Sequence, residues 1–81
     1  VAVEDLITSF GIALDAQADL HPDIAGQIER VGPDQYRIAV NGRDGYYRRR
    51  FTMAHELGHF LLHRDLIEAG VDDNRAYRSV D

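Results

Sequence analysis

The spacing of hydrophobic positions changes along the chain and separates helical from extended segments. Apolar residues recur at three- and four-residue intervals from Val3 to Phe10, which predicts a short amphipathic helix that ends at Gly11. From Ile12 to Ala16 apolar positions alternate with smaller or polar ones, a pattern typical of a short strand. A helix followed by a strand is therefore expected at the start of the chain.

Two longer strands are predicted next. They cover Ile24 to Val31 and Gln35 to Asn41, and Gly32-Pro33-Asp34 between them is a favourable turn sequence. The dipeptides Asn41-Gly42 and Asp44-Gly45 then indicate a polar loop. The two strands are expected to pair as an antiparallel hairpin.

A long helix is predicted to start between Tyr46 and Arg50 and to end near His63 or Arg64. Its expected buried stripe consists of Phe51, Ala54, Leu57, Gly58 and Leu61. The order of a short helix, a small antiparallel sheet and a long helix predicts the α+β class.

The last part of the chain gives a weaker pattern. Leu66 to Ala69 is compatible with one helical turn ended by Gly70, and Val71 to Asp81 is mostly polar and predicted to be a loop. At 81 residues the whole chain is expected to form a single domain with a modest core.

Five residues, His55-Glu56-Leu57-Gly58-His59, form an HExxH motif within the long predicted helix. Histidines four positions apart lie on one helix face, with Cβ atoms about 5–6 Å apart. Their imidazoles can then bind one Zn²⁺, each at about 2.0–2.1 Å. Glu56 is placed to take a proton from water at such an ion. The motif predicts a hydrolytic site with His55 and His59 as metal ligands and Glu56 as general base.

The alternative, an inert helix face that happens to carry these residues, agrees less well with the surroundings. Gly58 lowers helix propensity by about 1 kcal/mol relative to alanine, which suggests close packing of the backbone there. His63 continues the four-residue spacing, but eight helical residues place it about 12 Å along the axis from His55. We expect His63 to cap the helix C-terminus and His21 to be a surface residue.

A catalytic zinc usually has three protein ligands and a water molecule, and the motif supplies two of the ligands. The metzincin arrangement is excluded, because Leu62 and Asp65 stand where it needs glycine and histidine. Asp65 and Glu68 follow the helix too closely to fold back. Asp72 or Asp73 is far enough along the chain to reach the ion, although a solvated polar loop is the favoured role for that pair. The thermolysin-like arrangement uses a glutamate on a later helix.

Composition narrows the range of functions. The chain has no cysteine, which excludes disulfides and Cys-rich zinc sites. Its net charge of −5 does not favour nucleic acid, so the arginines at 43 and 48–50 are expected to pair within the domain. No apolar run approaches membrane-spanning length, and no signal pattern is visible. We expect a cytoplasmic protein that binds neither membranes nor nucleic acid directly.

The stretch from Arg50 to His63 resembles the signature R-F-T-x-A-H-E-L-G-H-x-x-x-H of the ImmA/IrrE family of bacterial and phage metallopeptidases. The resemblance implies a zincin-like fold and a cytoplasmic zinc peptidase that is often encoded with a helix-turn-helix repressor, which it cuts or inactivates. His55 and His59 match the family's zinc ligands, and Glu56 matches its general base. The family's third ligand is a glutamate in a later stretch, E-x-x-A-N-x-F-A, which this sequence lacks. Residues 1–81 are therefore expected to be the N-terminal portion of a metallopeptidase domain.

The sequence thus predicts a zinc-dependent metallopeptidase whose substrate is a repressor or a similar regulatory protein. Tyr77 or one of the arginines at 48–50 is a candidate oxyanion donor, although a structural role is favoured for each. A substrate peptide is expected to add to an edge of the small sheet. The alternative is a regulatory module that binds metal and a repressor without cleavage. Glu56 favours the enzyme, because a simple binding site would not need it. The pair of histidines also accepts other divalent ions.

Overall fold

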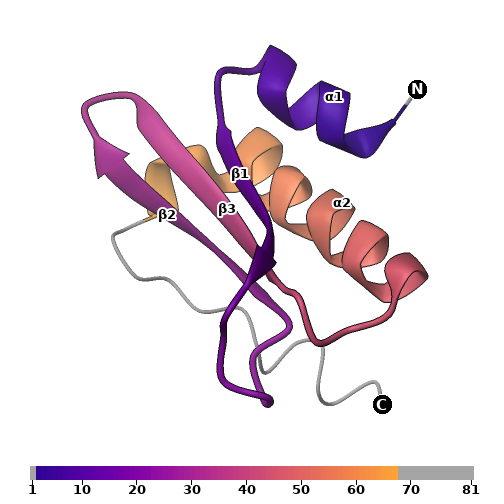
Figure 1. Ribbon diagram of the computed structural model, residues 1–81. Coiled ribbons are helices and arrows are strands. Elements are labelled where there is room, and N and C mark those ends of the chain that lie inside the picture. The colour runs from indigo at the N-terminus through magenta and orange to yellow at the C-terminus, as the bar shows by residue number, and fades with distance from the viewer. Residues whose placement is uncertain (1, 68–81) are drawn as a thin grey trace.

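The computed structural model describes residues 2–67 and arranges them as two helices against one face of a small sheet (Figure 1). The elements in chain order are α1 (Val3–Ser9), β1 (Ala13–Ala18), β2 (Gly26–Gly32), β3 (Gln35–Asn41), α2 (Tyr46–His63) and a 3-10 turn (Arg64–Leu66). The predicted α+β class is confirmed. No helix within the described range is long and apolar enough to cross a membrane.

The sheet is mixed, with strand order β1-β3-β2. β2 and β3 form the predicted antiparallel hairpin, with Ile28 opposite Ile38, and the chain turns at Pro33-Asp34. β1 runs parallel to β3, with Leu14 opposite Ile38, so the expectation of a wholly antiparallel sheet is wrong for this strand. The chain reverses once after β1 and once after β2. The hairpin occupies one edge of β3, and β1 pairs with the other edge in the same direction as β3.

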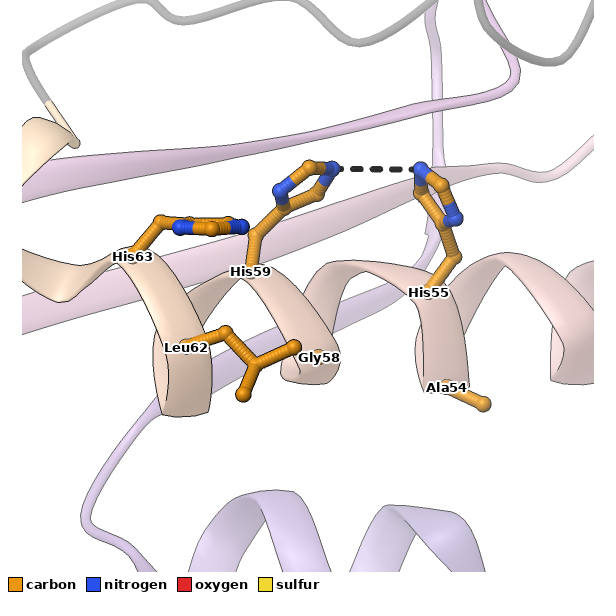
Figure 2. Close-up of a pocket in the computed structure, with 6 residues that line it drawn as sticks. All are labelled: Ala54, His55, Gly58, His59, Leu62 and His63. Carbon is orange, nitrogen blue, oxygen red and sulfur yellow. Dashed lines mark hydrogen bonds between the residues drawn. The ribbon is translucent and has the colours of Figure 1, made fainter.

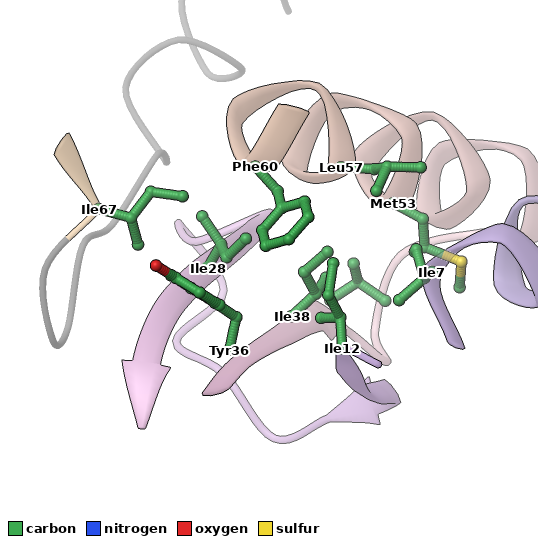
Figure 3. Packing of buried hydrophobic residues seen from close by; sticks show 10 residues of the cluster. Ile7, Ile12, Ile28, Tyr36, Ile38, Met53, Leu57, Phe60 and Ile67 are labelled. Carbon is green, nitrogen blue, oxygen red and sulfur yellow. The ribbon is translucent and has the colours of Figure 1, made fainter. Parts of the chain in front are cut away.

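The hydrophobic core lies between α2 and the sheet, and α1 closes one end of it (Figure 3). Phe60 is central: its ring packs edge-on against Tyr36, with centroids 5.1 Å apart, and lies 5.9 Å from the ring of Phe10. The core residues are Ile7, Ile12, Ile28, Tyr36, Ile38, Val40, Met53, Leu57, Phe60 and Ile67. Burial of each large apolar side chain contributes about 1.5–3 kcal/mol relative to exposure, so this cluster provides most of the stability of the domain.

The predicted buried stripe of α2 is wrong at most of its positions. Leu57 is buried, but Phe51 and Leu61 are 63% and 52% exposed, Ala54 is exposed and Gly58 is half-buried. The residues that α2 buries are Thr52, Met53, Glu56, Leu57 and Phe60. Apolar residues lie on two faces of this helix, and a period of 3.6 residues fits both. The face that carries the polar side chains of Thr52 and Glu56 is the one that packs on the sheet.

The predictions for the end of the chain fall mainly outside the described residues. Leu66 ends the 3-10 turn and is 75% exposed, while Ile67 is buried in the core. The rest of the predicted turn to Ala69, its end at Gly70 and the predicted loop from Val71 to Asp81 lie outside residues 2–67.

Close contact between β2 and α2 depends on a glycine at position 26. A Cβ atom added to Gly26 would lie 2.4 Å from Cγ2 of Thr52 and 3.1 Å from the carbonyl oxygen of Ala39. A contact below 3.0 Å forces a shift, so a larger residue would displace the Thr52 side chain or the helix that carries it. In contrast, a Cβ atom added to Gly58 would have no neighbour within 4 Å.

We predict opposite effects for alanine at these two glycines. Gly26→Ala should lower the free energy of unfolding by about 1–3 kcal/mol, because it overpacks the contact between β2 and α2. Gly58→Ala is the control and should raise the free energy of unfolding by up to about 1 kcal/mol through helix propensity. Urea denaturation followed by circular dichroism measures both. Equal effects of the two substitutions would contradict this account of the packing.

Candidate metal centre

His55 and His59 meet on one side of α2 (Figure 2). Their Nε2 atoms lie 3.2 Å apart, and their rings are nearly perpendicular with centroids 4.7 Å apart. Two nitrogens that each lie 2.0–2.1 Å from one tetrahedral ion are about 3.3–3.4 Å apart. The observed separation is close to this value, and in the structure it corresponds to a hydrogen bond between the two rings. Both side chains are half-buried, so the nitrogens are held in place without being closed off.

Glu56 lies on the inner side of α2. Its side chain is completely buried, and Oε2 would be 3.5 Å from a Cβ atom placed on Gly26. Successive residues of a helix are turned by about 100°, so a carboxylate directly after His55 points toward β2 when the imidazole points outward. The glycine at position 26 leaves room for this carboxylate.

A shallow depression of about 230 Å³ lies along α2 at the histidine pair (Figure 2). Its lining residues are Ala54, His55, Gly58, His59, Leu62 and His63. These form two rows with a four-residue repeat, one of histidines and one of small or aliphatic residues. His63 is the last residue of α2, where a capping role was expected, and its ring also lines this depression. The four-residue repeat places His63 in line with His55 and His59. That this row lines a depression depends on which face of α2 packs on the sheet, and the repeat does not specify that face.

The described residues supply two of the three expected ligands. Among residues 2–67, no group of three His, Cys, Asp or Glu side chains is close enough to hold one ion. Asp65 is exposed in the 3-10 turn. The other predicted candidates, Glu68, Asp72, Asp73 and the possible oxyanion donor Tyr77, lie outside the described residues.

The arginines at 48–50 pair with neighbouring parts of the domain. Arg48 lies 3.9 Å from the carboxylate of Asp44, Arg49 donates to the carbonyl oxygens of Asp44 and Ala16, and Arg50 pairs with Glu4 at 2.9 Å. None of the three lines the depression. Their contacts agree with a structural role, in which they anchor the start of α2 to α1 and to the end of β1.

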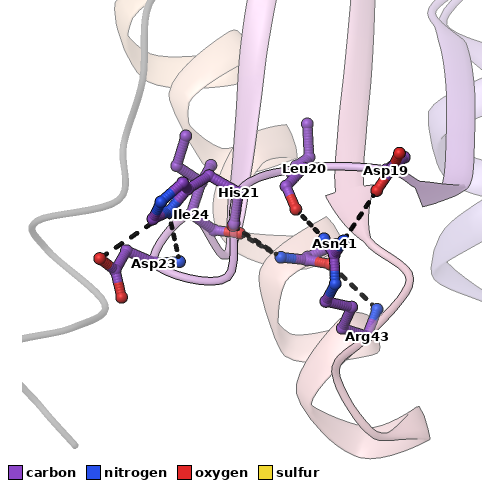
Figure 4. Close-up of polar contacts among 7 residues, drawn as sticks. All are labelled: Asp19, Leu20, His21, Asp23, Ile24, Asn41 and Arg43. Carbon is purple, nitrogen blue, oxygen red and sulfur yellow. Dashed lines mark hydrogen bonds and ion pairs between the residues drawn. The ribbon is translucent and has the colours of Figure 1, made fainter.

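The loop at residues 19–25 is held by a buried amide (Figure 4). Nδ2 of Asn41 donates to the carbonyl oxygens of His21 and Ile24 at 3.0 and 2.9 Å, and Oδ1 accepts from the backbone N–H of Arg43 at 2.9 Å. His21 is exposed, as predicted. The loop leads directly into Gly26, so Asn41 indirectly positions the strand residue that faces Glu56.

Arg43 ties the outer part of the same loop. Its guanidinium donates to the carbonyl oxygen of Leu20 and lies 3.0 Å from a carboxylate oxygen of Asp19. Both charged side chains of this ion pair are largely exposed, so water screens their attraction. The buried amide of Asn41 is therefore the stronger constraint on the loop.

We predict that Asn41→Asp will lower the free energy of unfolding by about 1–3 kcal/mol, because it removes both donors and leaves two carbonyl groups without them. Arg43→Gln, the control, should cost less than about 1 kcal/mol. Urea denaturation of the two variants tests the difference. If Arg43→Gln were the more damaging change, the loop would depend on the ion pair and not on the amide.

Comparison with known families gives one match. A family model described as the IrrE N-terminal-like domain, Peptidase_M78, matches residues 10–79. The matched range includes all three strands and the HExxH helix. Comparisons with curated proteins and with solved structures find no match.

Proposed function

Because this chain belongs to the IrrE N-terminal-like domain family, a family of metallopeptidases, we propose that it forms the zinc-binding part of a zinc-dependent peptidase. In this proposal His55 and His59 are the metal ligands and Glu56 is the general base. The observation that carries the proposal is the 3.2 Å separation of the two Nε2 atoms, which suits two ligands of one tetrahedral ion.

Each of the three residues has a distinct task in the proposed reaction. Zinc, when bound, supplies a Lewis acid that activates water and polarises the scissile carbonyl. The two imidazoles bind through Nε2 and fix the position of the reaction beside α2. The carboxylate of Glu56 takes the proton of the attacking water and passes it to the leaving amine. In the structure this carboxylate is buried beside Gly26 and does not line the depression, so its side chain would have to turn toward the histidine pair to act on the water.

A complete site needs a third ligand from outside residues 2–67. Asp72 or Asp73 is one candidate, and a glutamate beyond residue 81 is the other. The second fits the expectation that this chain is the N-terminal portion of a metallopeptidase domain. Either carboxylate would have to approach the depression from the open side of the histidine pair.

The proposed substrate is a protein segment, and specifically a helix-turn-helix repressor or a similar regulatory protein in the cytoplasm. The open shape of the depression and its row of small residues, Ala54 and Gly58, suit an extended main chain. In the sheet formed by the described residues β1 and β2 are the edge strands, which allows a peptide to add to the sheet. The repressor itself is suggested by the family resemblance.

A metal-binding module that binds a repressor without cleaving it is the second candidate. The observation that favours it is the set of only two ligands within the described residues. The two functions differ in their need for Glu56, which contributes to catalysis but not to metal binding.

We predict about one zinc per chain after dialysis, measured by mass spectrometry of the metal content. His59→Ala should lose this zinc, whereas Glu56→Gln should retain it, because only the histidine is a ligand. If the 81-residue chain retains no zinc, the same measurement on a longer polypeptide that includes the third ligand decides the question. A longer polypeptide without zinc would contradict the proposed function.

We predict that Glu56→Gln will reduce cleavage of a repressor substrate by about 10²–10⁴-fold, the usual contribution of a general base. The assay uses the zinc-loaded polypeptide, with electrophoresis to detect the products. His21→Ala is a control with an exposed histidine outside the depression and should cleave normally. Repressor binding without cleavage by the wild-type protein would instead support the non-catalytic module.

A further inference from the structure

The three histidines of α2 form two overlapping pairs. His55 and His59 are four residues apart, and so are His59 and His63, so His59 belongs to both pairs. The His63 ring lies on the side of His59 away from His55, with its centroid 6.0 Å from that of His59 and the ring planes at 44° (Figure 2). All three side chains line the same depression.

We propose that His59 and His63 form a second binding site for Zn²⁺ or a similar divalent ion, and that this site excludes binding at His55 and His59. The inference rests on the proposed function, because it assumes that the first pair holds the functional ion. It assigns to His63 a role in metal binding in addition to its place at the helix end.

The second pair has the same four-residue spacing as the first, and residues four apart on a helix have Cβ atoms about 5–6 Å apart. His63 ends α2 with φ −135° and ψ 31°, outside the helical region, and its ring centroid lies 6.0 Å from that of His59, against 4.7 Å for the first pair. The side chain of His63 is exposed, and within residues 2–67 the ring contact with His59 is its only interaction. Exposed side chains change rotamer in picoseconds to nanoseconds, so the His63 ring can turn toward an ion held by His59.

One ion cannot bind to all three histidines. His55 and His63 are separated by about 12 Å along the helix axis, whereas zinc–nitrogen bonds are about 2.0–2.1 Å. A neutral imidazole carries one acceptor nitrogen, because its other nitrogen is protonated. His59 can therefore serve one pair at a time, and the two sites are alternatives.

The consequence is a metal position that cannot support hydrolysis. An ion at His59 and His63 would be displaced along the axis of α2 by four residues, about 6 Å, in the direction away from Glu56. Filling the second site would remove His59 from the first. His63 would then limit the fraction of protein whose ion lies beside the general base.

The test measures zinc binding directly, by isothermal titration calorimetry of the 81-residue chain with Zn²⁺. His55→Ala keeps only the second pair, and His63→Ala keeps only the first. We expect both variants to bind zinc, with dissociation constants within about tenfold of each other, a difference of 1.4 kcal/mol. His55→Ala/His63→Ala keeps neither pair and should bind at least about tenfold more weakly than His55→Ala.

His55→Ala/His21→Ala is the matched control, because it also removes a second histidine but one outside the depression; it should bind like His55→Ala. Circular dichroism of each variant establishes that α2 is formed, and His55→Gln replaces His55→Ala if the helix content falls. The proposal is overturned if zinc binding by His55→Ala equals that of the variant that also lacks His63. In that case, retained binding by His63→Ala leaves the proposed function intact. Absence of zinc binding by both His63→Ala and the wild type would overturn the second site, and the zinc content of the longer polypeptide would then decide the proposed function.

Discussion

The arrangement of the domain depends on the contact between α2 and the beginning of β2, where position 26 has no side chain. This contact sets how α2 is rotated about its axis. Thr52 and Glu56 face the strand closely, since a Cβ atom at Gly26 would lie 2.4 Å from one and 3.5 Å from the other. With that face turned inward, His55 and His59 are directed to the side, where their nitrogens converge in an open depression. A packing constraint on one strand residue thus determines the orientation of the candidate metal centre.

The local parts of the fold followed from the sequence. The bounds of β3 and the extent of α2 agree with the predicted segments, and the two histidines converge as their four-residue spacing requires. These features depend on neighbours along the chain. The buried face of α2 did not follow, because apolar residues with helical spacing lie on two faces, and only the tertiary contact with Gly26 distinguishes them. The parallel pairing of β1 also depends on which edge of β3 the hairpin leaves open.

In the candidate site, too, some features depend on neighbours along the chain and others on tertiary contacts. A motif within one helix predicts two candidate ligands and a candidate base, because one turn of helix fixes their relative positions. A ligand from another element depends on how that element packs, which spacing along the chain does not determine. His55, His59 and His63 form one row along α2. A regular helix repeats a ligand geometry at every fourth position, so specificity for one pair has to come from what surrounds it.

The pairing of β1 with β3 also has a consequence while the chain is being synthesised. β1 leaves the ribosome before β2 and β3, yet among residues 2–67 its strand partner in the sheet is β3. The hairpin of β2 and β3 is local and can close within microseconds, whereas β1 has to wait until that hairpin exists. During this interval β1 presents an unpaired edge that other chains could join. Asp15 is an exposed charged residue within this strand. A charge at this position opposes pairing with other chains during the interval before β3 is available.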